Sequence, residues 1–87
     1  MNYKNKVVII TGGSKGIGEG CVRVFVEAGA KVVFCARKQN EGESLANELN
    51  SLGKGEAFFI KCDVSKTVDI QNLISQTVET YGQIDCL

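Results

Sequence analysis

Histidine and proline are both absent from this sequence of 87 residues. Without histidine the chain lacks the commonest metal ligand, and its cysteines stand singly with no C-x-x-C pair, so we expect no metal site. The cysteines fall in or beside apolar runs, where a free thiol behaves as a small core residue; they are Cys21, Cys35, Cys62 and Cys86. The absence of proline is typical of a chain made almost wholly of regular helices and strands.

Long apolar runs and blocks of like charge are also missing. The longest apolar run, Val32 to Ala36, has five residues. A membrane-spanning helix needs roughly 18 or more, and the core of a signal peptide about 7 to 15. Ten basic and ten acidic residues give zero net charge, with no cluster that would follow a nucleic-acid backbone. The sequence therefore predicts a cytoplasmic protein with neither a membrane nor a nucleic acid as its partner.

Short apolar runs rich in β-branched and aromatic residues predict the strands. They lie at 6–11, 32–35 and 57–60, and a fourth is expected at 84–87. Because these runs are apolar throughout and alternate with helical segments, a parallel sheet covered on both faces is expected. The predicted fold is an α/β doubly wound parallel sheet, Rossmann-like, and cut off in or after its fourth strand. No repeat or linker divides it, so a single domain is expected.

The helical spacing of apolar residues predicts three helices between the strands. They are expected to end at Gly29, near Gly53 and at Gly82, and Ser65 is expected to be the N-cap of the third. The residues predicted to face the sheet are Ile17, Cys21, Val24, Phe25 and Ala28 in the first helix, Leu45, Leu49 and Leu52 in the second, and Ile70, Leu73, Ile74, Val78 and Tyr81 in the third.

A glycine-rich loop joins the first predicted strand to the first predicted helix. Its sequence is Thr-Gly-Gly-Ser-Lys-Gly-Ile-Gly over residues 11–18. Unpaired backbone N–H groups and the positive end of the helix dipole lie at such a helix N-terminus, and glycines let a pyrophosphate approach them. The loop therefore predicts dinucleotide binding, although its G-x-x-x-G-x-G spacing differs from G-x-G-x-x-G, and a merely tight turn is the alternative. A mononucleotide kinase or GTPase is disfavoured because the G-K-[ST] ending is missing.

The same loop also contains G-x-S-x-G over residues 12–16, the pattern of the nucleophile elbow of serine hydrolases. In that interpretation Ser14 would attack an acyl carbon with the help of a histidine base. The chain has no histidine, and the loop follows the first predicted strand, with no earlier part of a sheet to help form an oxyanion hole. A serine hydrolase is therefore the weaker alternative.

Charged residues after the second predicted strand indicate which dinucleotide is bound. NAD-selective sites place an acidic residue about 20 positions past the loop, where it accepts hydrogen bonds from the ribose 2′-hydroxyl. Here Ala36 is followed by Arg37 and Lys38, and Arg37 lies 19 residues after Gly18. A guanidinium can hold a 2′-phosphate while Lys15 approaches from the other side, so the sequence favours NADP(H) over NAD(H). The alternative is that Arg37 and Lys38 are solvated loop charges.

Together with the segment Cys62-Asp63-Val64, these motifs make the chain resemble the short-chain dehydrogenase/reductase family over essentially its whole length. The runs at 7–18, 29–33 and 81–87 look closest to the 17-beta-hydroxysteroid dehydrogenase type 14 subgroup. That subgroup is associated with NAD and with an acidic residue where this chain has Ala36. The resemblance to this subgroup thus predicts NAD, whereas Arg37 and Lys38 predict NADP(H). We follow the prediction from these two residues.

The resemblance implies the NAD(P)(H)-binding part of an oxidoreductase that transfers hydride between a nicotinamide and an alcohol or ketone, with hydroxysteroids among the candidate substrates. It also implies a homo-oligomer for the complete protein. The roles it implies are the pyrophosphate loop for Gly12, Gly16 and Gly18, the lining of the adenosine ribose and diphosphate for Ser14, Lys15 and Ile17, and the adenine for Asp63 and Val64. A turn or a residue before a helix cap is the alternative role of Asp63.

The residues that carry catalysis in this family are not found in the chain. The family uses a Tyr-x-x-x-Lys pattern, a serine and an asparagine, but Tyr3 is followed four places on by Val7, and Tyr81 by Asp85. We therefore assign no catalytic residue. We expect residues 1–87 to be the N-terminal part of a single NAD(P)-binding domain and to be inactive alone. A non-catalytic dinucleotide-binding module is the alternative function.

Overall fold

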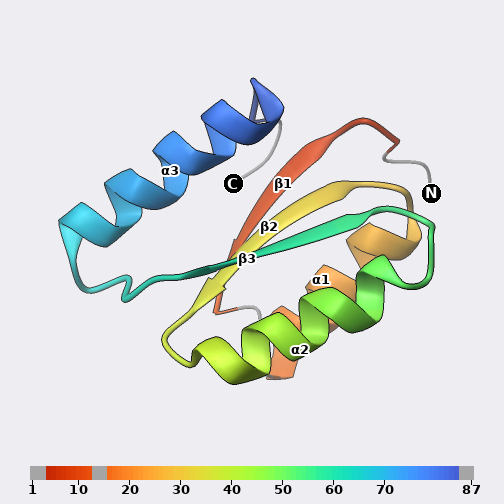
Figure 1. The fold of residues 1–87 in the computed structure, drawn as a ribbon, viewed down its shortest axis with the longest axis horizontal. Coiled ribbons are helices and arrows are strands. Elements are labelled where there is room, and N and C mark those ends of the chain that lie inside the picture. Colours follow the sequence, from red (N-terminus) through yellow and green to blue (C-terminus); the bar gives the residue numbers. More distant parts are fainter. Residues whose placement is uncertain (1–3, 13–15, 85–87) are drawn as a thin grey trace.

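The structure is a computed structural model and describes residues 4–12 and 16–84. In chain order the described elements are β1 (Val7–Thr11), α1 (Gly16–Glu27), β2 (Lys31–Ala36), α2 (Gln39–Asn50), β3 (Glu56–Lys61) and α3 (Thr67–Tyr81). Strand β2 is central and pairs in parallel with β1 and β3 (Figure 1). Each of these strands begins and ends within one residue of its predicted bounds.

Helices cover both faces of the sheet. Figure 1 shows α1 and α2 on one side of the strands and α3 on the other. Successive residues of β2 point to opposite faces, so Phe34 packs in the cluster under α1 and α2, while Val33 and Cys35 pack in the cluster under α3. The doubly wound parallel fold predicted from the sequence is confirmed.

Helix α1 matches its predicted face only in part, because Phe25 packs against the core whereas Ile17, Cys21 and Val24 are exposed. Val22 and Val26 are fully buried against the sheet, whereas Ile17 is 88% exposed and Val24 is 50% exposed. The prediction was wrong because apolar side chains surround much of α1, so spacings of three and four residues fit two sides of the helix. The Val26 side faces inward and packs in the core cluster with strand residues such as Val8 and Phe34.

Helices α2 and α3 match their predicted faces in part. The predicted residues that are buried are Leu45, Leu49 and Leu73, and those that are exposed are Leu52, Ile74 and Val78. Leu52 is exposed because α2 ends at Asn50, two residues earlier than this side chain requires. In α3 the inner face continues from Leu73 to Thr77, whose buried hydroxyl donates a hydrogen bond to the Leu73 carbonyl at 2.7 Å. The outer apolar residues of α3 therefore remain at the surface.

The start of α3 differs from the prediction. The helix begins at Thr67, with Lys66 in the N-cap position and no side-chain cap. Ser65, the predicted cap, instead donates its backbone N–H and its hydroxyl to Oδ1 of Asp63, at 3.0 and 2.7 Å. The prediction failed because a serine two residues after an aspartate can donate to the aspartate's turn instead of capping a helix.

The end of α3 agrees with the prediction. Gly82 closes the helix in the left-handed conformation, with φ of 75°. The side chain of Gln83 then donates a hydrogen bond to the Asn5 carbonyl at 3.1 Å, which brings this end of the chain beside the start of β1. Ile84 belongs to no strand, and the rest of the predicted fourth strand, 85–87, lies outside the described residues.

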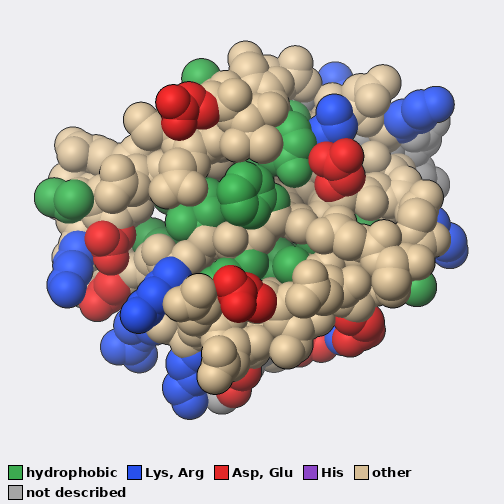
Figure 2. Space-filling model, viewed as in Figure 1, with side chains coloured by type: hydrophobic (Ala, Val, Ile, Leu, Met, Phe, Trp, Pro, Cys, Tyr) green, Lys and Arg blue, Asp and Glu red, His purple; other side chains and the backbone are tan. Residues whose placement is uncertain are grey.

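The two faces of the sheet are covered to different extents. On the side seen in Figure 2, hydrophobic side chains are visible in the middle of the molecule, between α3 and the strands. The outer side of α3 adds the exposed residues Val68, Ile74 and Val78. No helix within the described parts of the chain has the length and apolar character needed to cross a membrane.

Candidate functional site

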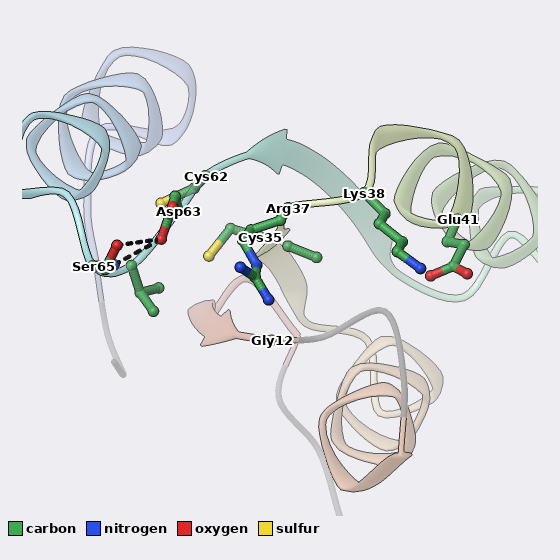
Figure 3. A pocket seen from close by; sticks show the side chains of 10 residues that line it. Gly12, Cys35, Arg37, Lys38, Glu41, Cys62, Asp63 and Ser65 are labelled. Carbon is green, nitrogen blue, oxygen red and sulfur yellow. Dashed lines mark hydrogen bonds between the residues drawn. The ribbon is translucent and has the colours of Figure 1, made fainter.

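The carboxyl ends of the three strands surround a cavity of about 790 Å³. Its lining comprises Gly12 after β1, residues 35–38 at the end of β2, residues 62–65 at the end of β3, and Glu41 from α2 (Figure 3). In open parallel sheets, ligands bind outside the carboxyl ends of the strands, and small-molecule sites have volumes of roughly 300–1,000 Å³. This cavity is therefore the candidate binding site.

The structure brings together half of the residues that the sequence predicted for cofactor binding. Those that line the cavity are Gly12, Arg37, Lys38, Asp63 and Val64. Those that lie in the first turn of α1, outside the lining, are Gly16, Ile17 and Gly18. Ser14 and Lys15 are outside the described residues. The cavity is thus formed by the strand ends, with the start of α1 following directly on the glycine loop.

Two glycines at the ends of the loop adopt backbone conformations that other residues rarely adopt. Gly12 has φ of 69° and Gly16 has φ of 60°. Gly16 is also the first residue of α1, so the unpaired N–H groups and positive dipole end of a 12-residue helix lie where the loop ends. This arrangement can bind an anion such as a pyrophosphate.

Asp63 is held by the turn after β3. Its Oδ1 atom accepts the two hydrogen bonds from Ser65, and its backbone N–H donates to Oδ2 of Asp69 at 3.0 Å. The bonds from Ser65, followed by the weaker attraction of Arg37, lower the pKa of Asp63, so the carboxylate is charged at neutral pH. Asp63 therefore has the turn role that the sequence left open. Its Oδ2 atom accepts no hydrogen bond from the described residues and can still accept one from a ligand.

Two cations and one carboxylate line the side of the cavity near α2. Arg37 and Lys38 follow β2 directly, and neither forms an ion pair with another described residue. Figure 3 shows the guanidinium of Arg37 extending toward Gly12. Glu41, in the first turn of α2, also lines the cavity, which the sequence analysis missed. Its spacing of three residues from Lys38, at the start of a predicted helix, was the available signal.

Two thiols that the sequence assigned only to the core also line the cavity. Cys35 and Cys62 are 0% and 2% exposed, which confirms their burial. Burial, and then the neighbouring Cys35, raises the pKa of the Cys62 thiol to about 11, so this thiol is protonated at neutral pH. Cys21 was predicted to be buried but is exposed on α1, and Cys86 lies outside the described residues.

Tyr81 lies near the amino ends of the strands, whereas the cavity lies at their carboxyl ends. Its ring centroid is 5.5 Å from Nζ of Lys31, and Lys31 and Glu56 are the first residues of β2 and β3. Burial, and then Glu56, raises the pKa of Tyr81 to about 12. A catalytic acid or base needs a pKa near the working pH, so neither the position nor the ionisation of Tyr81 suits proton transfer in the cavity.

Comparison with known proteins gives the family. The short chain dehydrogenase family pattern matches residues 6–87. The chain belongs to the short-chain dehydrogenase family. L-fucose dehydrogenase of Rattus norvegicus is 47% identical over 85 residues, which are 98% of this chain and 30% of that protein. Short-chain dehydrogenase reductase 3a of Arabidopsis thaliana is 43% identical over 87 residues, which are 100% of this chain and 33% of that protein.

Solved structures of the family have the same fold. A short chain dehydrogenase from Mycobacterium smegmatis has a TM-score of 0.88 at 35% identity, over 94% of this chain and 35% of its own. An alcohol dehydrogenase from the archaeon Thermococcus sibiricus, complexed with 5-hydroxy-NADP, has a TM-score of 0.87 at 34% identity, over 92% of this chain and 34% of its own. This short-chain dehydrogenase chain thus spans about a third of the length of the relatives it matches.

Proposed function

We propose that this chain binds NADP(H) in preference to NAD(H) in the cavity at the strand ends, as the N-terminal part of a single Rossmann-like domain. The observation that supports this most is the position of Arg37, which follows β2 directly and extends across the cavity toward Gly12 (Figure 3). A guanidinium there can form paired, charge-assisted hydrogen bonds with a 2′-phosphate. The relative from Thermococcus sibiricus was solved with 5-hydroxy-NADP, which agrees with this chemistry.

The other residues of the proposed site follow the path of a dinucleotide. Asp63 accepts a hydrogen bond from the adenine amino group through Oδ2, and the backbone of Val64 lies beside the adenine ring. Lys38 adds a second positive charge near the 2′-phosphate, while Glu41 opposes it and reduces the preference. The residues proposed to shape or line the pyrophosphate and ribose path are Gly12, Ser14, Lys15, Gly16, Ile17 and Gly18.

For the whole protein we propose hydride transfer between the nicotinamide and an alcohol or ketone, in a cytoplasmic homo-oligomer. The name of the rat relative makes L-fucose a candidate substrate. A hydroxysteroid substrate and membership of the type 14 subgroup rest on sequence resemblance alone, because neither the rat nor the Arabidopsis relative is named for a steroid. Since the chain contains no Tyr-x-x-x-Lys, the 87-residue chain alone should reduce no NADP⁺ with L-fucose or a steroid alcohol. Turnover above a heat-inactivated control would contradict this expectation.

The cofactor preference can be tested with one double variant. We expect the wild type to bind NADP(H) about ten- to a hundredfold more tightly than NAD(H), because a hydrogen bond to a charged group contributes about 1.5 to 3 kcal/mol. The variant Ala36→Asp, Arg37→Leu should reverse this preference, since an aspartate accepts hydrogen bonds from the 2′-hydroxyl and repels a 2′-phosphate.

The matched control is Lys54→Leu, which removes an exposed cation from the loop between α2 and β3, away from the cavity lining. Its preference should equal that of the wild type. Dissociation constants for the reduced cofactors can be measured by fluorescence titration. Equal affinities in the wild type, or an unchanged preference in the double variant, would refute the proposed role of Arg37.

A further inference from the structure

Two thiols from different strands lie together beneath the candidate cofactor cavity. Cys35 belongs to β2 and Cys62 follows β3, and both are members of the buried cluster on the α3 face of the sheet. Both also line the cavity, and Figure 3 shows their sulfur atoms at neighbouring strand ends. A pair of thiols on one face, next to a cavity that opens to solvent, is a potential ligand set for a soft metal ion.

The strand register shows how these thiols can be joined. Cys35 is opposite Ile60, so Cys62 lies two residues further along β3. With strands roughly 4.8 Å apart and a rise of roughly 3.3 Å per residue, the two Cα atoms are separated by roughly 8 Å. A disulfide needs roughly 4.4 to 6.8 Å between the Cα atoms. The pair therefore cannot close directly unless the strands move, but an ion placed between the two sulfur atoms can bridge them.

We propose that Cys35 and Cys62 form a two-thiolate site for a soft monovalent cation of the Cu⁺ or Ag⁺ class. On binding, each S–H bond breaks and an S–metal bond forms, the two protons pass to solvent, and no atom changes its oxidation state. Soft thiolates favour such ions, which accept two ligands in a line. A structural zinc ion requires about four ligands. The described residues bring together no group of three or more His, Cys, Asp or Glu side chains.

Because Cys35 and Cys62 line the cavity, a metal ion bound between them would affect the binding of the cofactor. Cys62 directly precedes Asp63, which the proposed function assigns to the adenine. An ion held between Cys35 and Cys62 would fill part of the cavity floor and fix the two strand ends at a new separation. We therefore expect a bound ion to weaken binding of NADPH, an expectation that rests on the proposed function, whereas the metal site itself does not.

The site can be tested with Ag⁺ as the probe. The background is the full chain with Cys21→Ser and Cys86→Ser, so that only the pair remains. Equilibrium dialysis against a competing thiol, together with the ultraviolet absorption of the silver–thiolate bond, should detect one tightly bound Ag⁺ per chain. Adding Cys62→Ser or Cys35→Ala to this background should abolish the tight site. Circular dichroism melting checks that each variant is folded, and Cys62→Ser at the strand end remains decisive if Cys35→Ala does not fold.

Several outcomes would overturn the proposal. Two Ag⁺ ions per chain would show two independent thiols, and no bound ion would show that the pair is inaccessible. Tight binding that survives the loss of one thiol would also exclude a two-thiolate site. An NADPH titration with and without Ag⁺ then separates the two proposals. If NADPH does not bind to the untreated protein while one Ag⁺ still does, the proposed function fails and the metal site stands; if NADPH binds equally well to the silver-loaded protein, the competition is refuted.

Discussion

Gly18 and Gly20 provide a matched pair for testing the glycine loop. Both are in the first half of α1, but Gly18 is partly buried next to the loop, whereas Gly20 is exposed and a Cβ atom there would meet nothing within 4 Å. We expect Gly18→Val to abolish NADPH binding, because the added side chain occupies the path of the diphosphate. Gly20→Val should bind NADPH like the wild type.

Both changes place a β-branched residue in the same helix, so they carry a similar cost in helix propensity. A difference in cofactor affinity between them therefore reports on the diphosphate path and not on the stability of α1. Isothermal titration calorimetry gives the affinities, and thermal melting confirms that both variants are folded. Equal dissociation constants for the two variants would mean that the loop is only a turn.

Asp63 and Ser65 offer a second test at single residues. We expect Ser65→Ala to raise the pKa of Asp63 part of the way toward its ordinary value, because the variant loses the hydroxyl donor but keeps the backbone N–H. A ¹³C-detected NMR titration of the carboxyl group measures this change directly. A pKa equal to that of the wild type would contradict the hydrogen bonds at this turn.

The direction of the shift also fixes how this turn responds to pH. The pKa of Asp63 is lower in the folded state than its ordinary value of 3.8. The hydrogen bonds from Ser65 therefore stabilise the folded state above that ordinary value, and their contribution is lost as the pH falls through the lower folded-state pKa. Ser65→Ala should consequently lower the free energy of unfolding above pH 3.8, including at neutral pH, and the difference from the wild type should shrink as the pH falls below the folded-state pKa.

Helix α2 packs tightly against the sheet at Gly42. A Cβ atom at Gly42 would overlap the ring of Phe59, which packs at 5.4 Å from the ring of Phe34. We expect Gly42→Ala to lower the free energy of unfolding by about 1 to 3 kcal/mol, because overpacking at this contact forces α2 or the rings to move. Intrinsic propensity alone predicts the opposite sign, a gain of up to about 1 kcal/mol for alanine in a helix.

The control for this prediction is Gly20→Ala in α1, where the new methyl group meets open space. That variant should gain stability from helix propensity, so the two alanine substitutions should change the free energy of unfolding in opposite directions. Urea denaturation followed by circular dichroism measures both. A stabilised Gly42→Ala variant would show that α2 can move away from Phe59 without loss.

The elements illustrate which features sequence patterns can predict. The three described strands were predicted to within one residue because short apolar runs rich in β-branched and aromatic residues have few alternative structures, and Gly82 ended α3 as expected. The inner face of α1 was predicted only at Phe25, because Val22 and Val26 are buried by packing against residues far along the chain, such as Leu49 and Ala57 in the same core cluster. The contact between Arg23 and Glu48, at 2.6 Å across α1 and α2, depends on tertiary structure in the same way.

In the candidate site, too, some residues could be assigned from the local sequence and others come together only through the tertiary structure. Residues within two positions of a strand end, such as Arg37 and Asp63, could be assigned to the cavity because parallel strands end at one edge. The pairing of Cys35 with Cys62 could not, since the two are 27 residues apart and meet only through the register of β2 and β3. Ser65 was assigned to the wrong partner because a helix cap and an aspartate turn require the same local sequence.

The whole molecule combines a partly covered sheet with zero net charge. Strands β1 and β3 are the outer strands of the described sheet. Asn50 covers part of the β3 edge by exchanging two hydrogen bonds of 2.8 Å with the backbone of Ala57. On the side of the sheet that α3 covers, hydrophobic side chains are visible beside this helix (Figure 2), and the outer side of α3 exposes Ile74 and Val78. Formal net charge is zero at pH 7, so little electrostatic repulsion opposes contact between copies.

We therefore expect the 87-residue chain alone to self-associate, most strongly near its isoelectric point of about 6.2. Val78→Lys should shift the population toward the monomer, because it removes an apolar side chain that is 47% exposed and adds a charge. Gln76→Lys adds the same charge at an exposed polar position of α3, so it separates the effect of charge from that of apolar contact. Sedimentation velocity over a range of concentrations measures the association. If the wild-type chain stays monomeric and melts cooperatively, the exposed apolar residues of α3 do not cause self-association. If both lysine variants dissociate equally, net charge and not the apolar face of α3 controls the association.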